Sequence, residues 1–361
     1  MATIVAVETA LPSYIVTRDE GREMARRLFS DVFRDMDRLL TVFDHAEIDQ
    51  RQFCVPLEWF TTPKSFQEKN RQYQLSAVTL GVEAAKSALE AARIAAKDID
   101  AIIFVSSTGI ATPSLDVRIA QSLGLREDTK RLPLFGLGCA GGASGLARAY
   151  DYVTAHPQDM VLLVAVELCG LTFIHGDRSK SNLIGTALFS DGAAAVLVVG
   201  AERRQENEEL FHGPRIKGSK SQLWPDSEDV MGWDLRNEGL AVIFSRDIPT
   251  LVRREMNDQM SQLLDYYSIT RHELTQFIAH PGGAKVLTAY EEALGIPTEW
   301  LESARKVLRH HGNMSSPTVL FALKHVLKQH QKYPASVQGY GILAALGPGF
   351  SCEQVLLDFN E

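Results

Sequence analysis

Cys139 stands in a setting that suits a nucleophile. The small residues Gly138, Ala140 and Gly141 surround it, between an apolar run typical of a strand and a pattern typical of a helix. At a helix N-terminus, unpaired N–H groups and the positive end of the helix dipole stabilise a thiolate, so we expect a lowered pKa for this thiol. The small neighbours would let a substrate carbonyl approach both the sulfur and the backbone amides.

The same segment allows two other interpretations. Gly136, Gly138 and Gly141 have the G-x-G-x-x-G spacing of a dinucleotide-binding turn, and Glu167 follows at the end of the next apolar run. Cys139 could also be a small buried residue in a tight contact between helix and sheet. The residues around Cys139 leave all three interpretations open.

Two other polar residues occupy similar corners of the chain. His280 follows a short apolar run and precedes Pro-Gly-Gly, and Asn313 precedes Met-Ser-Ser-Pro. A cysteine nucleophile works with a base and a further polar donor, which this pair would supply. Each could instead be a turn or cap residue, and a Cys-His-Asn hydrolase would use the same three groups. A dinucleotide-binding fold accounts for neither His280 nor Asn313.

The elements that must position these residues alternate along the chain. Apolar, β-branched runs predict strands, and longer amphipathic stretches predict helices, a pattern typical of α/β layers around a buried sheet. The predicted strands span 98–105, 131–137, 160–167, 193–199, 276–279, 340–346 and 354–359, after a first strand that ends near Pro12. The predicted helices span 113–124, with Thr112 as N-cap, and 141–155, 298–309 and 315–329.

Equal offsets indicate that the chain contains a duplication. Ser106 and His280 both follow a strand, at 280 − 106 = 174, and Cys139 and Asn313 both precede a helix, at 313 − 139 = 174. The polar stretch 201–210 is the best boundary, which predicts an N-terminal half of 1–205 with the cysteine and a C-terminal half of 206–361 with the histidine and asparagine.

Composition excludes several classes of function. The 361 residues contain 37 Lys and Arg against 45 Asp and Glu, a net charge of −8, which argues against a nucleic-acid-binding protein. The four cysteines form no C-x-x-C pair or His/Cys cluster, so we expect no metal site. Because 192–201 is too short to span a membrane and the N-terminus lacks a basic leader, we expect a soluble, cytoplasmic protein.

Five segments together resemble the type III polyketide synthases, the chalcone-synthase-like branch of the thiolase fold. They are GLGCAGGASGLARA around Cys139, SNLIGTALFSDGAA from Ser181, IAHPGG at His280, HGNMSSPTVLFAL at Asn313 and GPGF from Gly347. The resemblance covers nearly the whole chain and is strongest to bacterial alkylpyrone-forming members. It implies an α/β thiolase-like fold of two duplicated halves in αβαβα layers, a homodimer, and decarboxylative Claisen condensation without a metal or redox cofactor.

The resemblance also assigns catalytic roles. Cys139 would carry the starter acyl group, and His280 would sustain its thiolate as an ion pair. His280 and Asn313 would then hydrogen-bond the thioester carbonyl of malonyl-CoA, so that the enolate left by decarboxylation attacks the acyl group. The substrates would be acyl-CoA and malonyl-CoA, and the starter could also arrive on an acyl carrier protein.

Pocket residues follow from the same resemblance. Phe189 falls at the gatekeeper position between the coenzyme A tunnel and the reaction cavity, and Arg38 at one position that grips coenzyme A phosphates. Val242 replaces a second gatekeeper phenylalanine of the plant enzymes, Trp233 a glycine, and Thr112 a methionine that crosses the dimer. The other residues expected at the cavity are Cys169, Leu171, Thr172, Leu188 and Ser315.

These replacements direct the choice of starter. A smaller side chain at 112 or 242 could open an apolar channel for an alkyl tail, and each buried CH₂ contributes about 0.8 kcal/mol. We therefore expect a synthase that extends a long-chain fatty acyl-CoA to alkylpyrones or alkylresorcinols. The alternatives are a single-step β-ketoacyl synthase and a plant-like synthase with an aromatic starter.

Overall fold

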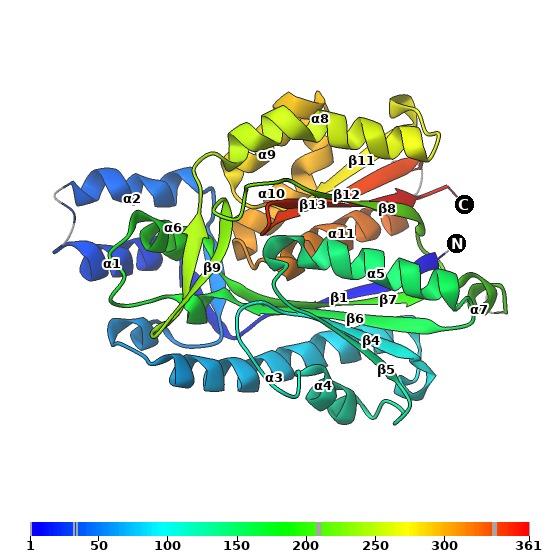
Figure 1. Ribbon diagram of the computed structural model, residues 1–361, viewed down its shortest axis with the longest axis horizontal. Coiled ribbons are helices and arrows are strands. Elements are labelled where there is room, and N and C mark those ends of the chain that lie inside the picture. The colour runs from blue at the N-terminus through cyan, green and yellow to red at the C-terminus, as the bar shows by residue number, and fades with distance from the viewer. Residues whose placement is uncertain (1, 32, 34, 207–210, 334–337, 361) are drawn as a thin grey trace.

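The main sheet of the protein runs through the whole molecule. The structure is a computed structural model that describes residues 2–31, 33, 35–206, 211–333 and 338–360. It has nine strands (Figure 1). Their order is β11 (Leu274–Ala279), β12 (Tyr340–Gly347), β13 (Ser351–Asp358), β8 (Arg215–Leu223), β1 (Ala2–Ala10), β7 (Asp191–Val199), β6 (Met160–Leu168), β4 (Ala101–Val105) and β5 (Lys130–Leu134).

The two halves of this sheet repeat one topology, which confirms the duplication. In the first half β1–β7 and β7–β6 pair antiparallel and β6–β4 parallel. In the second half β8–β13 and β13–β12 pair antiparallel and β12–β11 parallel. The halves join where Ala2 pairs with Ile216 and Thr3 with Arg215. The boundary predicted between 205 and 206 falls in α7 (Ala201–Glu206), and 207–210 lie outside the described residues.

Helices separate and cover the two halves of the sheet, in the expected αβαβα layers (Figure 1). The central layer contains α5 (Gly141–Ala155) and α11 (Ser316–Lys332), which belong to one core cluster with residues of both sheet halves. The outer layers are α8 (Ile248–Tyr266) with α9 (Ala284–Leu294), and α3 (Phe66–Ala92) with α4 (Asp116–Leu123).

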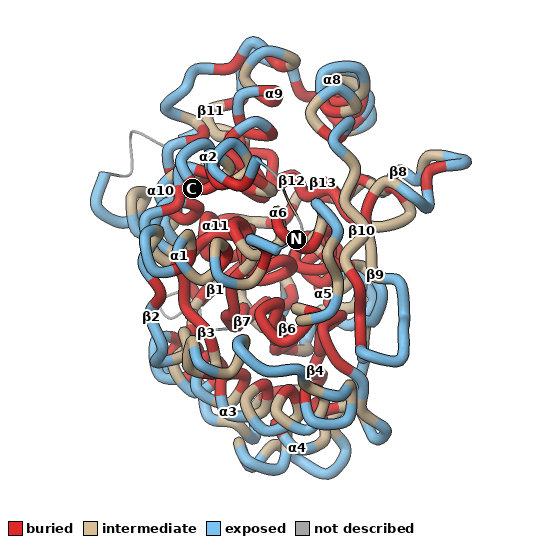
Figure 2. Tube along the Cα trace, turned by 90° about the vertical axis from the view of Figure 1, so that its left-hand side faces the viewer, coloured by how far each residue is buried: buried red, intermediate tan, exposed pale blue. Residues whose placement is uncertain are grey.

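The pattern of burial follows from these layers. Strands β6 and β7 have helices on both sides, so every one of their residues is buried, whereas the outward faces of α3 and α4 are exposed (Figure 2). The central helices approach each other closely, since a Cβ added at Gly142 of α5 would lie 2.2 Å from the carbonyl oxygen of Ser316 in α11. Glycine is therefore required where the two duplicated helices meet.

Several smaller elements gather at one end of the layers, and all of them except α2 carry cavity residues. They are β2 (Tyr14–Thr17), α1 (Arg18–Phe29), α2 (Met36–His45), β3 (Gln50–Phe53), α6 (Lys180–Leu188), β9 (Met231–Arg236) and β10 (Gly239–Phe244), whereas α10 (Glu302–His311) precedes the Asn313 corner. Strands β9 and β10 form a separate antiparallel hairpin. None of these elements except α10 was predicted from the sequence, because their patterns are short or irregular.

Several predicted boundaries differ from the structure by about three residues, among them the start of the strand predicted from 98, which is β4 and begins at Ala101, and two others bear on the site. The helix expected from 113 begins at Asp116 with Leu115 at the N-cap, so Thr112 lies in the preceding loop and does not cap it. The strand expected at 131–137 is β5, which ends at Leu134, because the chain turns through Gly136, with φ +85°, toward the Cys139 corner. Among the helices in the described ranges, none is both long and apolar enough to cross a membrane.

Candidate active site

Cys139, His280 and Asn313 lie around one cavity, as the sequence predicted. Cys139 is in a short helical turn directly before α5. Asn313 is in the loop just before α11, and His280 directly follows β11. The Cys139 Sγ lies 4.0 Å from the Asn313 Oδ1, and all three residues line a cavity of about 310 Å³. The duplicated corners therefore meet at the middle of the molecule, between the two halves.

The Asn313 amide is held in a defined orientation. Its Oδ1 accepts a hydrogen bond of 2.8 Å from the backbone N–H of Ser315, and its Nδ2 makes only a long one, 3.4 Å, to the carbonyl oxygen of Gly282. The backbone at Ser315 has φ +58°, a strained value for a residue other than glycine. This arrangement leaves the Nδ2 able to donate to a substrate oxygen beside His280.

His280 is buried with both ring nitrogens unused. It is 4% exposed, and neither Nδ1 nor Nε2 has a hydrogen-bond partner among the described residues. Burial lowers the pKa of the imidazole to about 3, so the ring is neutral near pH 7. A neutral imidazole has one donor and one acceptor nitrogen, and a buried ring with both unsatisfied is suited to bind a polar group of a substrate.

The expected lowering of the Cys139 pKa is wrong for the free protein. Burial raises the pKa of this thiol to about 11, and the nearby Glu167 carboxylate adds to the rise. Hydrogen bonds from Ser315 and Asn313 oppose the rise but are outweighed. Desolvation is the largest cause of the rise, and with this pKa the free thiol is protonated near pH 7, in the same cavity as a neutral imidazole.

Glu167, at the end of β6, holds together the loop after β4 and the start of α11 near Cys139 by hydrogen bonds. Its carboxylate is fully buried and accepts hydrogen bonds from the Ser107 N–H (2.9 Å), the Thr108 hydroxyl (2.7 Å) and the Ser316 hydroxyl (3.0 Å). Burial raises its pKa to about 7. Since all these acceptors are used within the protein, Glu167 cannot hold a ribose, and the dinucleotide interpretation is wrong.

A second cavity, of about 360 Å³, is also lined by Cys139. Four of the residues expected at the reaction cavity line it: Phe189, Trp233, Val242 and Ser315. The Phe189 ring centroid lies 5.9 Å from that of Trp233 and 6.5 Å from that of Phe244. The backbone of Phe189 also pairs with that of Asn313. Phe189, the residue expected to be the gatekeeper, is thereby joined through its backbone to a candidate catalytic residue.

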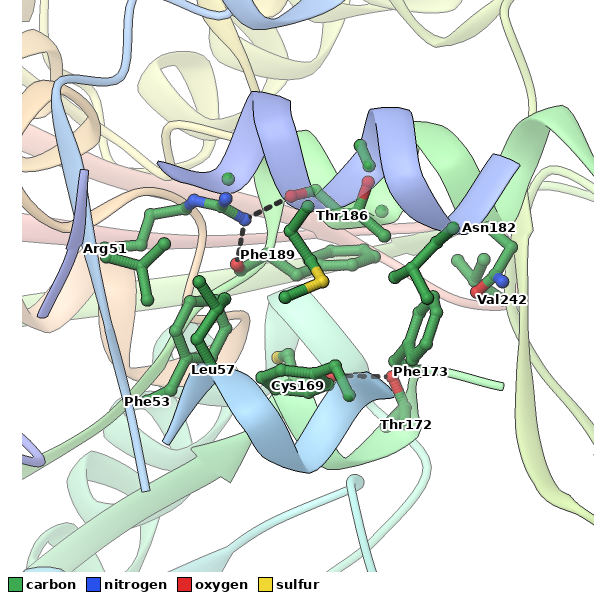
Figure 3. A pocket seen from close by; sticks show the side chains of 18 residues that line it. Arg51, Phe53, Leu57, Cys169, Thr172, Phe173, Asn182, Thr186, Phe189 and Val242 are labelled. Carbon is green, nitrogen blue, oxygen red and sulfur yellow. Dashed lines mark hydrogen bonds between the residues drawn. The ribbon is translucent and has the colours of Figure 1, made fainter. Parts of the chain in front are cut away.

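A larger apolar cavity, of about 630 Å³, extends beyond Phe189 and Val242, which line both spaces (Figure 3). Cys169 and Thr172, also expected at the cavity, lie on its wall. Apart from these residues its lining is dominated by apolar side chains: Val16, Met24, Ala25, Leu28, Phe53, Leu57, Phe60 and Phe173. The Arg51 guanidinium closes one side by donating to the carbonyl oxygens of Thr186 and Phe189.

Comparison with known proteins identifies this arrangement. The model of the N-terminal domain of chalcone and stilbene synthases matches residues 1–203, and that of their C-terminal domain matches residues 215–359. The chain belongs to the chalcone and stilbene synthase family. It is a type III polyketide synthase, an acyl-transferring enzyme with the thiolase-like fold, and the resemblance seen in the sequence is confirmed.

Three relatives illustrate the range of this family. A putative chalcone synthase of Bacillus subtilis is 43% identical, with 100% of each chain covered. The alpha-pyrone synthesis polyketide synthase-like protein of Mycobacterium tuberculosis is 28% identical over 99% of this chain and 91% of its own. The crystal structure of 1,3,6,8-tetrahydroxynaphthalene synthase from Streptomyces coelicolor A3(2) superposes with a TM-score of 0.91 at 27% identity, covering 99% of each chain.

Some residues expected from the family resemblance lie elsewhere. Leu171 borders a separate cavity of about 200 Å³, together with Thr172. Leu188 does not line the cavities around Cys139, because it is packed in the core cluster that contains the buried residues of α8 and α9. Thr112 is exposed, so within one chain it does not border the cavity, and Arg38 is exposed on α2.

Sequence reasoning missed several residues of the site. The hairpin contributes Met231 and Phe244, and α9 contributes Tyr290, to the cavity of His280. The hairpin lacks a strong strand signal, and Tyr290 looks like a core aromatic. In the described part of the chain no three metal-ligating side chains come together.

Proposed function

We propose that this polyketide synthase extends a long-chain fatty acyl-CoA with malonyl-CoA, in repeated decarboxylative condensations, to alkylpyrones or alkylresorcinols. The observation that supports this starter is the apolar cavity of about 630 Å³ that meets the reaction cavity at Phe189 and Val242. The name of the mycobacterial relative, an alpha-pyrone synthesis protein, agrees with the product class.

In the first step the starter moves to Cys139. The neutral His280 ring accepts the thiol proton as the sulfur attacks the thioester carbonyl of the acyl-CoA. The bond from the acyl carbon to the coenzyme A sulfur breaks, and the leaving thiolate takes the proton from His280. The acyl group is then a thioester of Cys139, and His280 is neutral again.

In the second step malonyl-CoA is extended. The His280 N–H and the Asn313 Nδ2 donate to the thioester oxygen of malonyl-CoA as its carboxylate leaves as carbon dioxide, and the bonding electrons form an enolate. The enolate carbon attacks the acyl carbon, the bond to the Cys139 sulfur breaks, and the sulfur leaves as a thiolate. For the next round this thiolate attacks the thioester of the elongated chain and releases coenzyme A; after the last round it takes up a proton. This sequence calls for no resident metal or redox cofactor, because hydrogen bonds in a buried site stabilise the developing charge.

The starter tail would pass between Phe189 and Val242 into the large apolar cavity. At about 0.8 kcal/mol per buried CH₂, each added carbon favours binding until the cavity is filled. The valine at 242 leaves this passage wider than a second phenylalanine would. The longest starter accepted then depends on how far the cavity extends before the tail meets α1, whose residues Met24, Ala25 and Leu28 form part of the lining.

The proposed enzyme is a homodimer, with Arg38 contributing to the grip on coenzyme A phosphates. Strand β5 is an edge of the main sheet, and four of its five residues are exposed. Leu132 and Phe135, 42% and 62% exposed, add apolar surface there. Pairing with a second copy would protect this edge, and Thr112 could then approach the partner's cavity.

Product analysis tests the proposal. Purified enzyme is incubated with malonyl-CoA and a series of starters from acetyl to stearoyl, including a cinnamoyl thioester, and the products are weighed by mass spectrometry. We expect tri- or tetraketide products, and fastest turnover with a long alkyl starter. Products with one added acetate unit, a preference for cinnamoyl, or normal turnover by Cys139→Ala would contradict the proposal. Parallel assays with acyl carrier protein thioesters determine the source of the starter.

A further inference from the structure

Tyr290 of α9 is a buried phenol that the proposed reaction does not use. It lines the same cavity of about 310 Å³ as Cys139, His280 and Asn313. The residue is 0% exposed, and its hydroxyl has no hydrogen-bond partner among the described residues. Tyr290 and His280 therefore share both one cavity and the same unsatisfied state.

The other side chains that line the cavity provide no hydrogen-bond partner for the Tyr290 hydroxyl. The side chains that complete the lining, apart from Gly282, are apolar: Met231, Phe244, Ile248, Val286 and Leu346. A buried hydroxyl without a partner is destabilising, so a residue that served only to fill space here would be better as phenylalanine. The ring itself packs against Phe277, with centroids 5.3 Å apart, and phenylalanine would keep that contact.

The hydroxyl is suited to donate rather than accept. Burial raises the pKa of Tyr290 above its ordinary value, and the nearby Cys352 adds to the rise, so the phenol keeps its proton. Malonyl-CoA presents carbonyl and carboxylate oxygens, which are acceptors. In the proposed reaction its thioester lies at His280 and Asn313, while the starter tail lies in the apolar cavity beyond Phe189 and Val242, which Tyr290 does not line.

We propose that the Tyr290 hydroxyl donates a hydrogen bond to an oxygen of the malonyl-CoA extender when it occupies the cavity of His280. Tyr290 is then a fourth polar group of this site, and it recognises the extender rather than the starter. This inference rests on the proposed function, because it takes malonyl-CoA as the molecule that enters this cavity.

Removal of the hydroxyl alone tests the inference. Tyr290→Phe should raise the KM for malonyl-CoA about two- to tenfold, the usual worth of one hydrogen bond, and leave the KM for the acyl-CoA starter unchanged. Its melting temperature should not fall, because an unsatisfied group is removed. The matched control is Tyr267→Phe, whose hydroxyl accepts from the Ser219 N–H outside the cavity. That variant should lose stability without a change in either KM.

Binding to the inactive Cys139→Ala protein identifies the oxygen that is recognised. Calorimetric titration with malonyl-CoA and with acetyl-CoA compares Tyr290 with phenylalanine in this background. Loss of affinity for malonyl-CoA alone assigns the carboxylate, and equal loss for both assigns the thioester or pantetheine part. Unchanged KM and affinity in Tyr290→Phe, with wild-type enzyme still condensing malonyl-CoA, would overturn the inference alone. Absence of condensation by the wild type would instead overturn the proposed function.

Discussion

At the scale of single residues, burial controls the chemistry of the site. The thiol of Cys139 and the imidazole of His280 both lose their charged forms to desolvation, with pKa values moved to about 11 and about 3. In the proposed mechanism the nucleophile is therefore generated by proton transfer from Cys139 to His280 when substrate is present. A protonated thiol is a weaker nucleophile than a thiolate, so we expect Cys139 to react slowly in the absence of substrate.

The neutral state of His280 predicts a pH dependence of stability. The unfolded chain binds this proton with an ordinary pKa of 6.5 and the folded chain with a pKa of about 3. The unfolded chain therefore takes up this proton below pH 6.5 and the folded chain does not. The free energy of unfolding keeps its full value above pH 6.5 and decreases as the pH falls toward 3. His280→Gln removes this term, so wild type should lose roughly 2 kcal/mol relative to the variant between pH 7 and pH 5. Urea unfolding at the two pH values measures it, and a constant difference would contradict a neutral buried ring.

Val242 predicts the selection of the starter. Val242→Phe places a ring in the passage between the reaction cavity and the large apolar cavity, opposite Phe189. We expect kcat/KM for a long-chain acyl-CoA to fall at least tenfold, while that for acetyl- or butyryl-CoA changes less than twofold. Steady-state assays across the starter series measure this. Equal losses for all starters would show that the tail does not use this passage.

At the scale of elements, the contact between α5 and α11 positions the site. Cys139 precedes one of these helices and Asn313 precedes the other, and their close approach fixes the 4.0 Å between the Cys139 Sγ and the Asn313 Oδ1. Glu167 at the end of β6 adds to this by binding Ser316 of α11. The relative positions of Cys139 and Asn313 are therefore set by a contact between the two duplicated halves.

A methyl group between these helices should disturb both corners. In Gly142→Ala the added Cβ would lie 2.2 Å from the Ser316 carbonyl oxygen, so the helices must move apart. We expect a loss of about 1–3 kcal/mol in the free energy of unfolding and a slower acylation of Cys139, measured by denaturation and by mass spectrometry of the acyl-enzyme. Gly176→Ala is the control, since nothing lies within 4 Å of its added Cβ. Equal behaviour of the two variants would contradict this view.

At the scale of the whole molecule, the exposed edge strand β5 predicts assembly. Phe135, which follows this strand, is 62% exposed, and a lysine there would place a charge in the proposed dimer contact. We expect wild type to have twice the chain mass of 39.9 kDa in light scattering, and Phe135→Lys to shift toward one chain. Tyr266→Lys on α8, at a residue 79% exposed, should leave the mass unchanged. A monomeric wild type would rule out the homodimer.

The amino-acid sequence was sufficient to predict the α/β layers and the three candidate catalytic residues. Local signals are sufficient for these features, because buried strands such as β6 are continuously apolar and because corner residues next to glycine stand out. The equal offsets of 174 were enough to place Asn313 opposite Cys139, since duplicated halves repeat their corners around one centre. The motifs then indicated the family, which the comparisons confirmed.

The pKa values and the packing of the residues around these three could be found only from the folded protein. A pKa depends on burial by the whole fold, so the helix N-terminus at Cys139 suggested the wrong direction. Whether a side chain faces a cavity depends on packing between distant elements, which is why Leu188 lies in the core and Tyr290 reaches the cavity of His280. The hairpin of β9 and β10 contributes cavity walls through contacts remote in sequence, and short strands give no periodic signal strong enough to reveal them.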